Sequence, residues 1–167
     1  MDPQRRPPGI DHPMVPKLLR LYSHAHVWVY QKTGGRLGNK WRIGAAFPRG
    51  VPVLLLTTIG RKSGVPKTTP LLYLADGDRV VIVGSQGGMP KHPQWYLNLT
   101  QNPEVEIQVG TRVRKMRARL ANPEERAALW PRLVDLYADF ATYQAWTDRA
   151  IPVVILDPAA PPSPEGR

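Results

Sequence analysis

Short apolar stretches separated by turn residues recur along most of this chain. The run VLLL at 53–56 shows no polar alternation, which is typical of a strand buried on both faces. One pair of stretches flanks the turn DGD at 76–78 and another pair flanks Gly110, so each pair is predicted to form a tight hairpin. The predicted strands cover residues 53–58, 68–75, 80–85, 105–109, 113–120 and 151–156. The last of these is uniformly apolar and is expected in the interior of the sheet.

Helical spacing of apolar residues appears first at 14–32, where the opposite face carries Lys17, Arg20, His24 and Lys32. This pattern predicts an amphipathic helix, and the sequence leaves two environments for its apolar face. It packs on the rest of the domain, or it contacts a membrane surface, where Trp28 and two tyrosines favour the headgroup region.

A second long helix is predicted at 122–139. Asn122 is placed to cap it, Pro123 suits its first position, and Glu125 completes a capping box. Shorter helices are predicted at 93–101, where Pro93 suits the first turn, and at 140–148. Local hydrogen bonding makes the start at Asn122 the most strongly specified element boundary in the chain.

Six strands with few intervening helices favour a β-barrel over a doubly wound sheet. The predicted class is mainly β with flanking helices (α+β). At 167 residues the chain suits one core of ordinary size. We divide it into a disordered tail (1–13), an N-terminal amphipathic helix and linker (14–50), a barrel domain (51–158) and a second disordered tail (159–167).

The net charge of +10 predicts an anionic partner: a nucleic acid, an acidic membrane surface or a polyanionic small ligand. The chain contains no cysteine, so it offers neither a disulfide nor a thiolate site. Its four histidines show no ligand spacing, and we expect no metal site. The motifs of serine hydrolases and Rossmann dehydrogenases are absent, and the lack of a long apolar run predicts a cytoplasmic protein.

Three segments carry candidate chemistry. The first, TTIGRKSGVPKTTPL, holds the cations Arg61, Lys62 and Lys67 beside Ser63 among glycines, which favours an anion site, although a solvated basic turn has the same composition. The second, VGSQGGMPKHPQWYLN, offers small residues at a strand end against which a flat ring can lie. Trp95 in that segment is either a wall for a ring or a core residue. The third is an aromatic cluster around Tyr137 and Tyr143, which lines a pocket or belongs to the core.

These segments resemble the deazaflavin-dependent nitroreductase family of actinobacteria. The matching stretches are LLLTTIGRKSGVPKTTPLLYLADGDRVVIVGSQGG, KHPQWYLNLTQNPEVEIQVG, ANPEERAALWPRLVDLY and YQAWTDRAIPVVILDP. The resemblance implies a split β-barrel, similar to FMN-binding proteins, that uses reduced coenzyme F-420 as hydride donor to a quinone, enone or nitroaromatic. It also implies a membrane contact for the N-terminal segment, on the inner face of the cell membrane.

The resemblance assigns roles to individual residues. Arg61, Lys62, Ser63 and Lys67 would meet the phosphate and carboxylates of the coenzyme. Its ring would be bordered by Thr69, Pro70, Leu71, Val83, Gly84 and Ser85, with Lys91 and Trp95 completing the site. Ser85, Tyr137 and Tyr143 would position the acceptor. The prodrug-activating member has a tyrosine where this chain has Phe140, so quinones and enones are expected to be better substrates than nitroimidazoles.

Two rival interpretations remain at this point. A nucleic-acid-binding barrel would explain the net charge, helped by five cations along the predicted strand 113–120 and the residue before it, although the exposed aromatic stripe expected for base stacking is absent. Alternatively, the same barrel binds FMN or haem.

Overall fold

The computed structural model describes residues 15–159, with side chains described from residue 23 onward. The predicted tails, 1–13 and 159–167, lie outside the described residues except for Ala159, whose N–H donates to the carbonyl oxygen of Lys115 at 3.2 Å. The division of the chain into tails, linker and barrel domain therefore stays a prediction.

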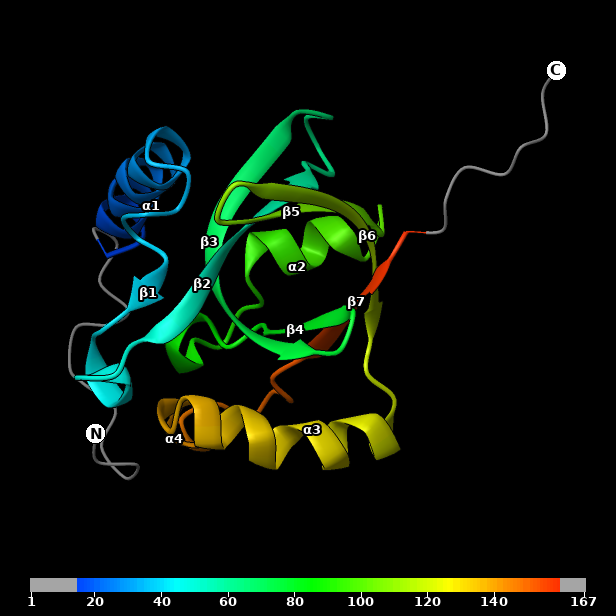
Figure 1. Cartoon of the computed structure of the whole chain (residues 1–167). Helices are drawn as coiled ribbons and strands as arrows, with labels where there is room; N and C mark the ends of the chain where they lie inside the picture. The colour runs from blue at the N-terminus through cyan, green and yellow to red at the C-terminus, as the bar shows by residue number, and fades with distance from the viewer. Residues whose placement is uncertain (1–14, 160–167) are drawn as a thin grey trace, which may run out of the picture.

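The centre of the molecule is a closed barrel of six antiparallel strands. The strands are β2 (Val51–Ile59), β3 (Pro66–Asp76), β4 (Arg79–Val83), β5 (Glu104–Val109), β6 (Arg112–Leu120) and β7 (Val153–Pro158). Their order is β2-β3-β4-β7-β6-β5, and β2 also pairs with β5, which closes the barrel (Figure 1). All six predicted strands and both predicted hairpins are confirmed, and β7 lies between β4 and β6 as its apolar sequence predicted.

Strands β4 and β7 are apolar on both faces because both of their faces are covered. In β4, Val80 and Ile82 point into the barrel, whereas Val81 and Val83 pack outside it. The inner core is closed by helix α2 (Gln94–Leu99), which contributes Trp95 and Leu99. The outer core lies between β4, β7 and helix α3 (Pro123–Leu136), where Leu129 and Leu133 are buried.

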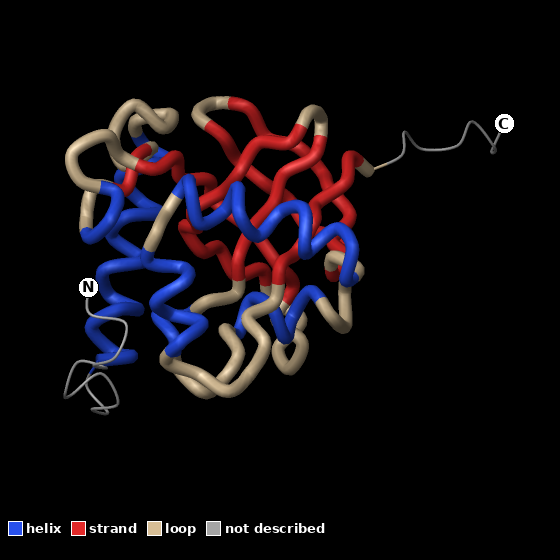
Figure 2. The backbone as a smooth tube through the Cα atoms, turned by 90° about the horizontal axis from the view of Figure 1, so that it is seen from below, coloured by secondary structure: helices blue, strands red, loops and turns tan. Residues whose placement is uncertain are grey.

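Helices α3 and α4 (Asp139–Ala145) cross the outside of the strands, as Figure 2 shows from their side of the molecule. The capping box predicted for α3 is present: Asn122 accepts from the Glu125 N–H, and the Glu125 side chain accepts from the Asn122 N–H. The helix ends at Leu136 rather than Asp139. Tyr137 is extended (φ −149°, ψ 95°) and turns its ring toward Phe140, 5.1 Å away between ring centroids.

Helix α1 (Val15–Lys32) confirms the predicted helix within the described residues, and the C-terminal end of the helix packs beside the barrel. The Tyr30 hydroxyl is buried, donates to the Val53 carbonyl at 3.2 Å and accepts from the Gly110 N–H at 2.9 Å. One side chain therefore joins the helix to β2 and to the turn between β5 and β6, which confirms contact with the barrel for this part of α1.

The segment predicted as a linker, 33–50, is more structured than expected. It contains β1 (Lys40–Trp41), which pairs with β2, and the short 3-10 turn η1 (Gly44–Ala46). A third short element, η2 (Gln86–Gly88), follows β4. These three elements are too short to show an apolar periodicity in the sequence. Tertiary contacts hold each of them in place.

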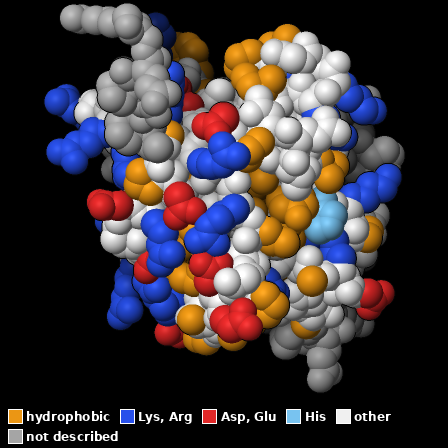
Figure 3. Space-filling view, turned by 90° about the vertical axis from the view of Figure 1, so that its right-hand side faces the viewer, with side chains coloured by type: hydrophobic (Ala, Val, Ile, Leu, Met, Phe, Trp, Pro, Cys, Tyr) orange, Lys and Arg blue, Asp and Glu red, His pale blue; other side chains and the backbone are white. Residues whose placement is uncertain are grey.

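Two of the four arginines of β6 lie beside acidic side chains. Arg117 pairs with Glu104, and Arg119 pairs with both Glu125 and Asp157. Figure 3 shows basic and acidic side chains interleaved on one face of the molecule. These pairs give Arg117 and Arg119 a structural role.

Within residues 15–159, no helix is long and apolar enough to cross a bilayer.

Candidate functional site

The end of β4 approaches the start of β7 more closely than most side chains permit. The Gly84 N–H donates to the Pro152 carbonyl at 2.9 Å, and a Cβ on Gly84 would lie 2.6 Å from Pro152 Cγ. Glycine is therefore required here. Val83 is buried in the outer core, whereas Ser85 is half-buried at the point where the chain leaves the sheet.

The segment 84–92, which we call the glycine loop, packs directly on α4. Gly88 has a φ of 73°, and a Cβ there would lie 2.9 Å from the Tyr143 carbonyl oxygen and 3.1 Å from Trp146 Cβ. Residues 84–92 and Tyr143 come from distant parts of the sequence, yet this contact brings their backbones side by side.

The hydroxyls of Tyr137 and Tyr143 lie 3.3 Å apart and form a hydrogen-bonded pair. Tyr137 is 4% exposed, whereas Tyr143 is half-buried, so Tyr143 is the more accessible of the two. Burial raises the pKa of Tyr137 well above its usual range, assisted by its hydrogen bonds to Tyr143 and Asp139. Burial likewise raises the pKa of Tyr143. Both phenols are therefore neutral at physiological pH and keep their protons for hydrogen bonding.

Asp139 lies beside the tyrosine pair and is hydrogen-bonded to Tyr137. Its carboxylate is buried and accepts a hydrogen bond from the Ala45 N–H at 3.1 Å. A Cβ on Gly44 would lie 2.4 Å from Asp139 Oδ2 and 3.0 Å from the Tyr137 hydroxyl. The turn η1 thus covers Tyr137 and Asp139, and it can do so only because residue 44 is glycine.

The cations predicted to form an anion site lie in residues 60–67, which we call the cation loop and which comprise the turn between β2 and β3 together with the first two residues of β3. Asn98 of α2 holds it in place, since its side-chain oxygen accepts from the Arg61 backbone N–H at 3.2 Å and from the Arg61 guanidinium at 3.3 Å. The guanidinium also donates to Gln94 at 2.9 Å. Lys62, Ser63 and Lys67 are exposed, and no ion pair joins either lysine to an acidic residue in the described part of the chain.

The remaining predicted ring-site residues occupy two environments. Thr69 and Leu71 pair with Leu56 and Leu54 in the register of β3 with β2, on the inner face, while Pro70 faces outward. Lys91 is exposed three residues before α2 begins. Trp95 is 6% exposed and belongs to the inner core. Any contact of Trp95 with a ligand would be made by the small exposed part of its ring.

The sequence interpretation missed three polar residues that organise the site. Asn98 holds the cation loop, Asp139 supports the tyrosine pair, and Arg149 donates hydrogen bonds into the glycine loop. Asn98 and Arg149 act on segments more than 30 residues away in sequence, and Asp139 joins its neighbour Tyr137 to the distant turn at Ala45. No local motif marks any of the three. Within the described residues, no group of acidic or histidine side chains could hold a metal ion.

Comparison with known proteins adds an independent line of evidence. Residues 22–158 match the family described as F420H2-dependent quinone reductase. The F420H2-dependent quinone reductase Rv1261c of Mycobacterium tuberculosis is 41% identical over 143 residues, covering 84% of this chain and 89% of the relative. The protein Rv3178 of the same organism is 51% identical over 117 residues, covering 70% of this chain and 98% of the relative.

Solved structures agree on the fold. One described as an F420-H2 dependent reductase, FDR-A, has a TM-score of 0.60 and 42% identity, covering 64% of this chain and 94% of its own. Another, described as a domain-swapped dimer, has a TM-score of 0.63 and 34% identity, covering 85% of this chain and 98% of its own. The barrel is therefore of the split β-barrel type that the sequence predicted, and this chain belongs to the F420H2-dependent quinone reductase family.

Proposed function

We propose that this protein transfers a hydride from reduced coenzyme F-420 to a conjugated apolar acceptor, with quinones as the preferred class. The observation that carries the proposal is the combination, in a chain of this family, of an anchored loop of unpaired cations with a buried pair of tyrosine hydroxyls beside a glycine loop. The first feature fits the anionic end of such a coenzyme, and the second fits a carbonyl acceptor.

The cation loop fits the phosphate and carboxylate groups because its charges are unused. Lys62 and Lys67 are exposed and make no ion pair within the described residues, so an anion would meet them without displacing a carboxylate. Arg61 is oriented by Gln94 and Asn98, which reduces the ordering that binding requires. Ser63 lies in the same turn and adds a hydroxyl donor.

We assign the planar head of the coenzyme to the region between β3 and the end of β4. Thr69, Pro70 and Leu71 would border it on one side, and Val83, Gly84 and Ser85 on the other, with Lys91 and Trp95 at the edge. When bound, the coenzyme supplies the hydride, and the protein orients the two reactants and excludes water.

The acceptor would lie against Ser85, Tyr137 and Tyr143. Tyr143 is the more accessible phenol of the pair and is protonated at physiological pH, so its hydroxyl can bond an acceptor carbonyl. Tyr137 and Asp139 lie behind it and restrict its orientation. The role of Ser85, Tyr137 and Tyr143 would be to position the acceptor, because both phenols keep their protons at physiological pH and act as hydrogen-bond donors.

Acceptor preference follows from Phe140. This side chain is 4% exposed and packs edge-on against Tyr137, so it presents no hydroxyl to a nitro group. We therefore expect turnover of menadione and cyclohexenone to exceed turnover of a nitroimidazole by roughly tenfold, the value of about one hydrogen bond. Equal turnover of the three acceptors would contradict this preference.

A peripheral membrane contact fits the exposed face of α1. His24, Trp28 and Lys32 recur every fourth residue, are all exposed and so share one face, with Trp28 62% exposed. An aromatic ring beside cationic groups is typical of helices that lie at an anionic lipid surface. Such a contact would place the enzyme near a lipid-soluble quinone. Sedimentation with anionic vesicles tests it: Trp28→Ser should reduce binding, and unchanged binding would contradict it.

The cofactor assignment is tested by titrating the protein with reduced coenzyme F-420. Arg61→Gln and Lys62→Gln should each weaken binding by roughly tenfold, the loss of one charge-assisted hydrogen bond, and the double variant by more. Lys115→Gln, an exposed lysine on β6, is the matched control and should bind normally. Unchanged affinity in the double variant, or tighter binding of FMN or haem than of the coenzyme, would overturn the proposal.

A further inference from the structure

The guanidinium of Arg149 is bonded to four acceptors of the glycine loop. It donates to the carbonyl oxygens of Met89 (2.9 Å), Gly84 (3.1 Å) and Ser85 (2.8 Å). Its fourth contact is His92 Nδ1 at 3.3 Å. One side chain thus joins both ends of the loop that carries Ser85 and Lys91.

Arg149 forms no ion pair within the described residues, although it is half-buried. Its charge faces the negative ends of three carbonyl dipoles and a ring nitrogen instead. Hydrogen bonds from a charged donor to such acceptors are stronger than neutral ones, and several donors in one planar group fix direction as well as distance. The backbone of the glycine loop has little conformational preference of its own, because residues 87 and 88 are both glycine.

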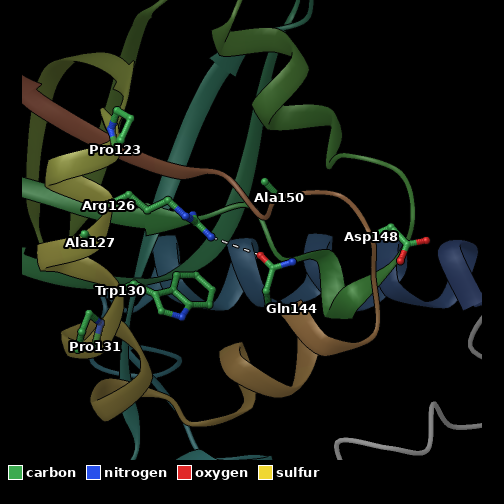
Figure 4. A pocket seen from close by; sticks show the side chains of 8 residues that line it. All are labelled: Pro123, Arg126, Ala127, Trp130, Pro131, Gln144, Asp148 and Ala150. Atoms are coloured by element: carbon green, nitrogen blue, oxygen red, sulfur yellow. Dashed lines mark hydrogen bonds between the residues drawn. The ribbon is translucent and has the colours of Figure 1, made fainter.

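The backbone of Arg149 is itself held in place from α4. Gln144 donates to the Arg149 carbonyl at 2.9 Å and accepts from the Ile151 N–H at 2.9 Å. Arg126 donates to the same Gln144 oxygen at 3.3 Å, as the dashed line in Figure 4 shows, at the wall of a pocket of about 650 Å³ between α3 and α4. The backbone of Arg149 is therefore fixed, and the Arg149 side chain holds the glycine loop relative to that backbone.

We propose that Arg149 is a positioning residue for the hydride transfer, holding the glycine loop in the shape that presents Gly84 and Ser85 to the reactants. This inference rests on the proposed function, because it assigns the glycine loop to the ring and acceptor. Arg149 acts through the backbone and contacts neither reactant. Its loss should disorder the geometry of the reacting pair while leaving the cation loop intact, since the latter is held by Asn98.

The test compares Arg149→Gln and Arg149→Lys with Arg132→Gln, an arginine of α3 that bonds Asp76 and neither Gln144 nor a residue of the glycine loop. For Arg149→Gln, kcat with menadione should fall by roughly 100-fold, since misplacement by about 1 Å has an effect of that size. The dissociation constant of the reduced coenzyme should change by less than about threefold, because charged contacts in the cation loop dominate affinity. Arg149→Lys keeps the charge but lacks the planar fork, and should recover part of kcat.

Amide hydrogen exchange gives a readout that does not depend on turnover. Protection at residues 84–92 should fall in Arg149→Gln and stay unchanged in Arg132→Gln. If kcat and loop protection are both unaffected in Arg149→Gln while the wild type reduces menadione with the coenzyme, the inference is wrong and the proposed function stands. If the wild type shows neither coenzyme binding nor turnover, the proposed function is wrong. A loss of protection confined to 84–92 would then still assign Arg149 its structural role.

Discussion

Asn98 and Arg61 are joined by two hydrogen bonds, one to the Arg61 backbone N–H and one to its guanidinium, both accepted by the same oxygen of Asn98. The nitrogen of that carboxamide donates to the buried Thr58 hydroxyl at 3.1 Å. The helix that closes the inner core and the cation loop on the surface thus share one buried amide. Folding and ligand binding are linked at this point.

Replacing Asn98 by leucine, which is similar in size, should therefore affect both properties. The Thr58 hydroxyl and the Arg61 N–H lose their partners, and we expect a loss of about 2–3 kcal/mol in the free energy of unfolding, measured by denaturant titration. Coenzyme affinity should also fall, because Arg61 is no longer oriented. A variant that is destabilised but binds the coenzyme normally would show that the orientation of Arg61 is unimportant.

The two tyrosines should respond differently to loss of the hydroxyl. Tyr143→Phe removes the accessible hydroxyl, so kcat/KM for menadione should fall by roughly tenfold, the value of one hydrogen bond. Tyr137→Phe removes a buried partner of Asp139 and should reduce stability by about 1–2 kcal/mol. Tyr73→Phe on β3 serves as control. An effect on kcat/KM that is larger in Tyr73→Phe than in Tyr143→Phe would contradict the assignment.

The start of α3 should make stability depend on pH. The pKa of Glu125 is lowered from 4.5 to about 2, first by the Arg119 guanidinium and then by the Asn122 N–H. Because the folded-state pKa lies below the unfolded one, this contribution is complete above pH 4.5 and is lost as the pH falls toward 2. Glu125→Gln keeps the capping acceptor but should flatten that part of the curve in denaturant titrations between pH 2 and 6.

The matched change at the cap is Asn122→Ala. It should reduce stability by about 1 kcal/mol at every pH in that range, because it removes a hydrogen bond without removing a titrating group. A pH dependence altered in Asn122→Ala but not in Glu125→Gln would show that Arg119 is not the main cause of the shift.

His92 should remain neutral to a lower pH than an exposed histidine. Burial lowers its pKa from 6.5, and the positive charge of Arg149 lowers it further. Its Nδ1 is then free to accept from Arg149. The unfolded chain takes up this proton near pH 6.5, so the stabilising effect is complete above 6.5 and declines as the pH falls through the lower folded-state pKa.

An NMR titration of the imidazole tests this directly, with His92→Gln identifying the signal. The midpoint should lie below 6.5 in the wild type and move upward in Arg149→Gln, while burial keeps it from returning fully to 6.5. A midpoint that does not respond to the loss of Arg149 would mean that the two side chains are not in contact in solution.

Much of the fold could be predicted because its signals are local. The apolar run of β7 indicates burial on both faces, the turns at Gly77 and Gly110 (φ 63° and 60°) require glycine, and the Asn122 cap needs only residues within one turn. The boundary errors, such as the end of α3 at Leu136, arise where a side chain leaves the helix to reach the core. Trp95 was ambiguous for a related reason, since the sequence does not say on which side of a barrel wall a short helix lies.

The sequence by itself determined which strands form, where the main helix starts, and which segments carry charge and aromatic rings, because alternation, turns and caps involve neighbours in the chain. Only the tertiary structure decided that Asn98 holds Arg61, that Asp139 lies behind Tyr137, and that Arg149 joins Gly84 to His92. These contacts depend on how the barrel closes. A buried polar side chain is satisfied by whichever backbone or side-chain group that closure brings within about 3 Å, and sequence separation carries no information about it.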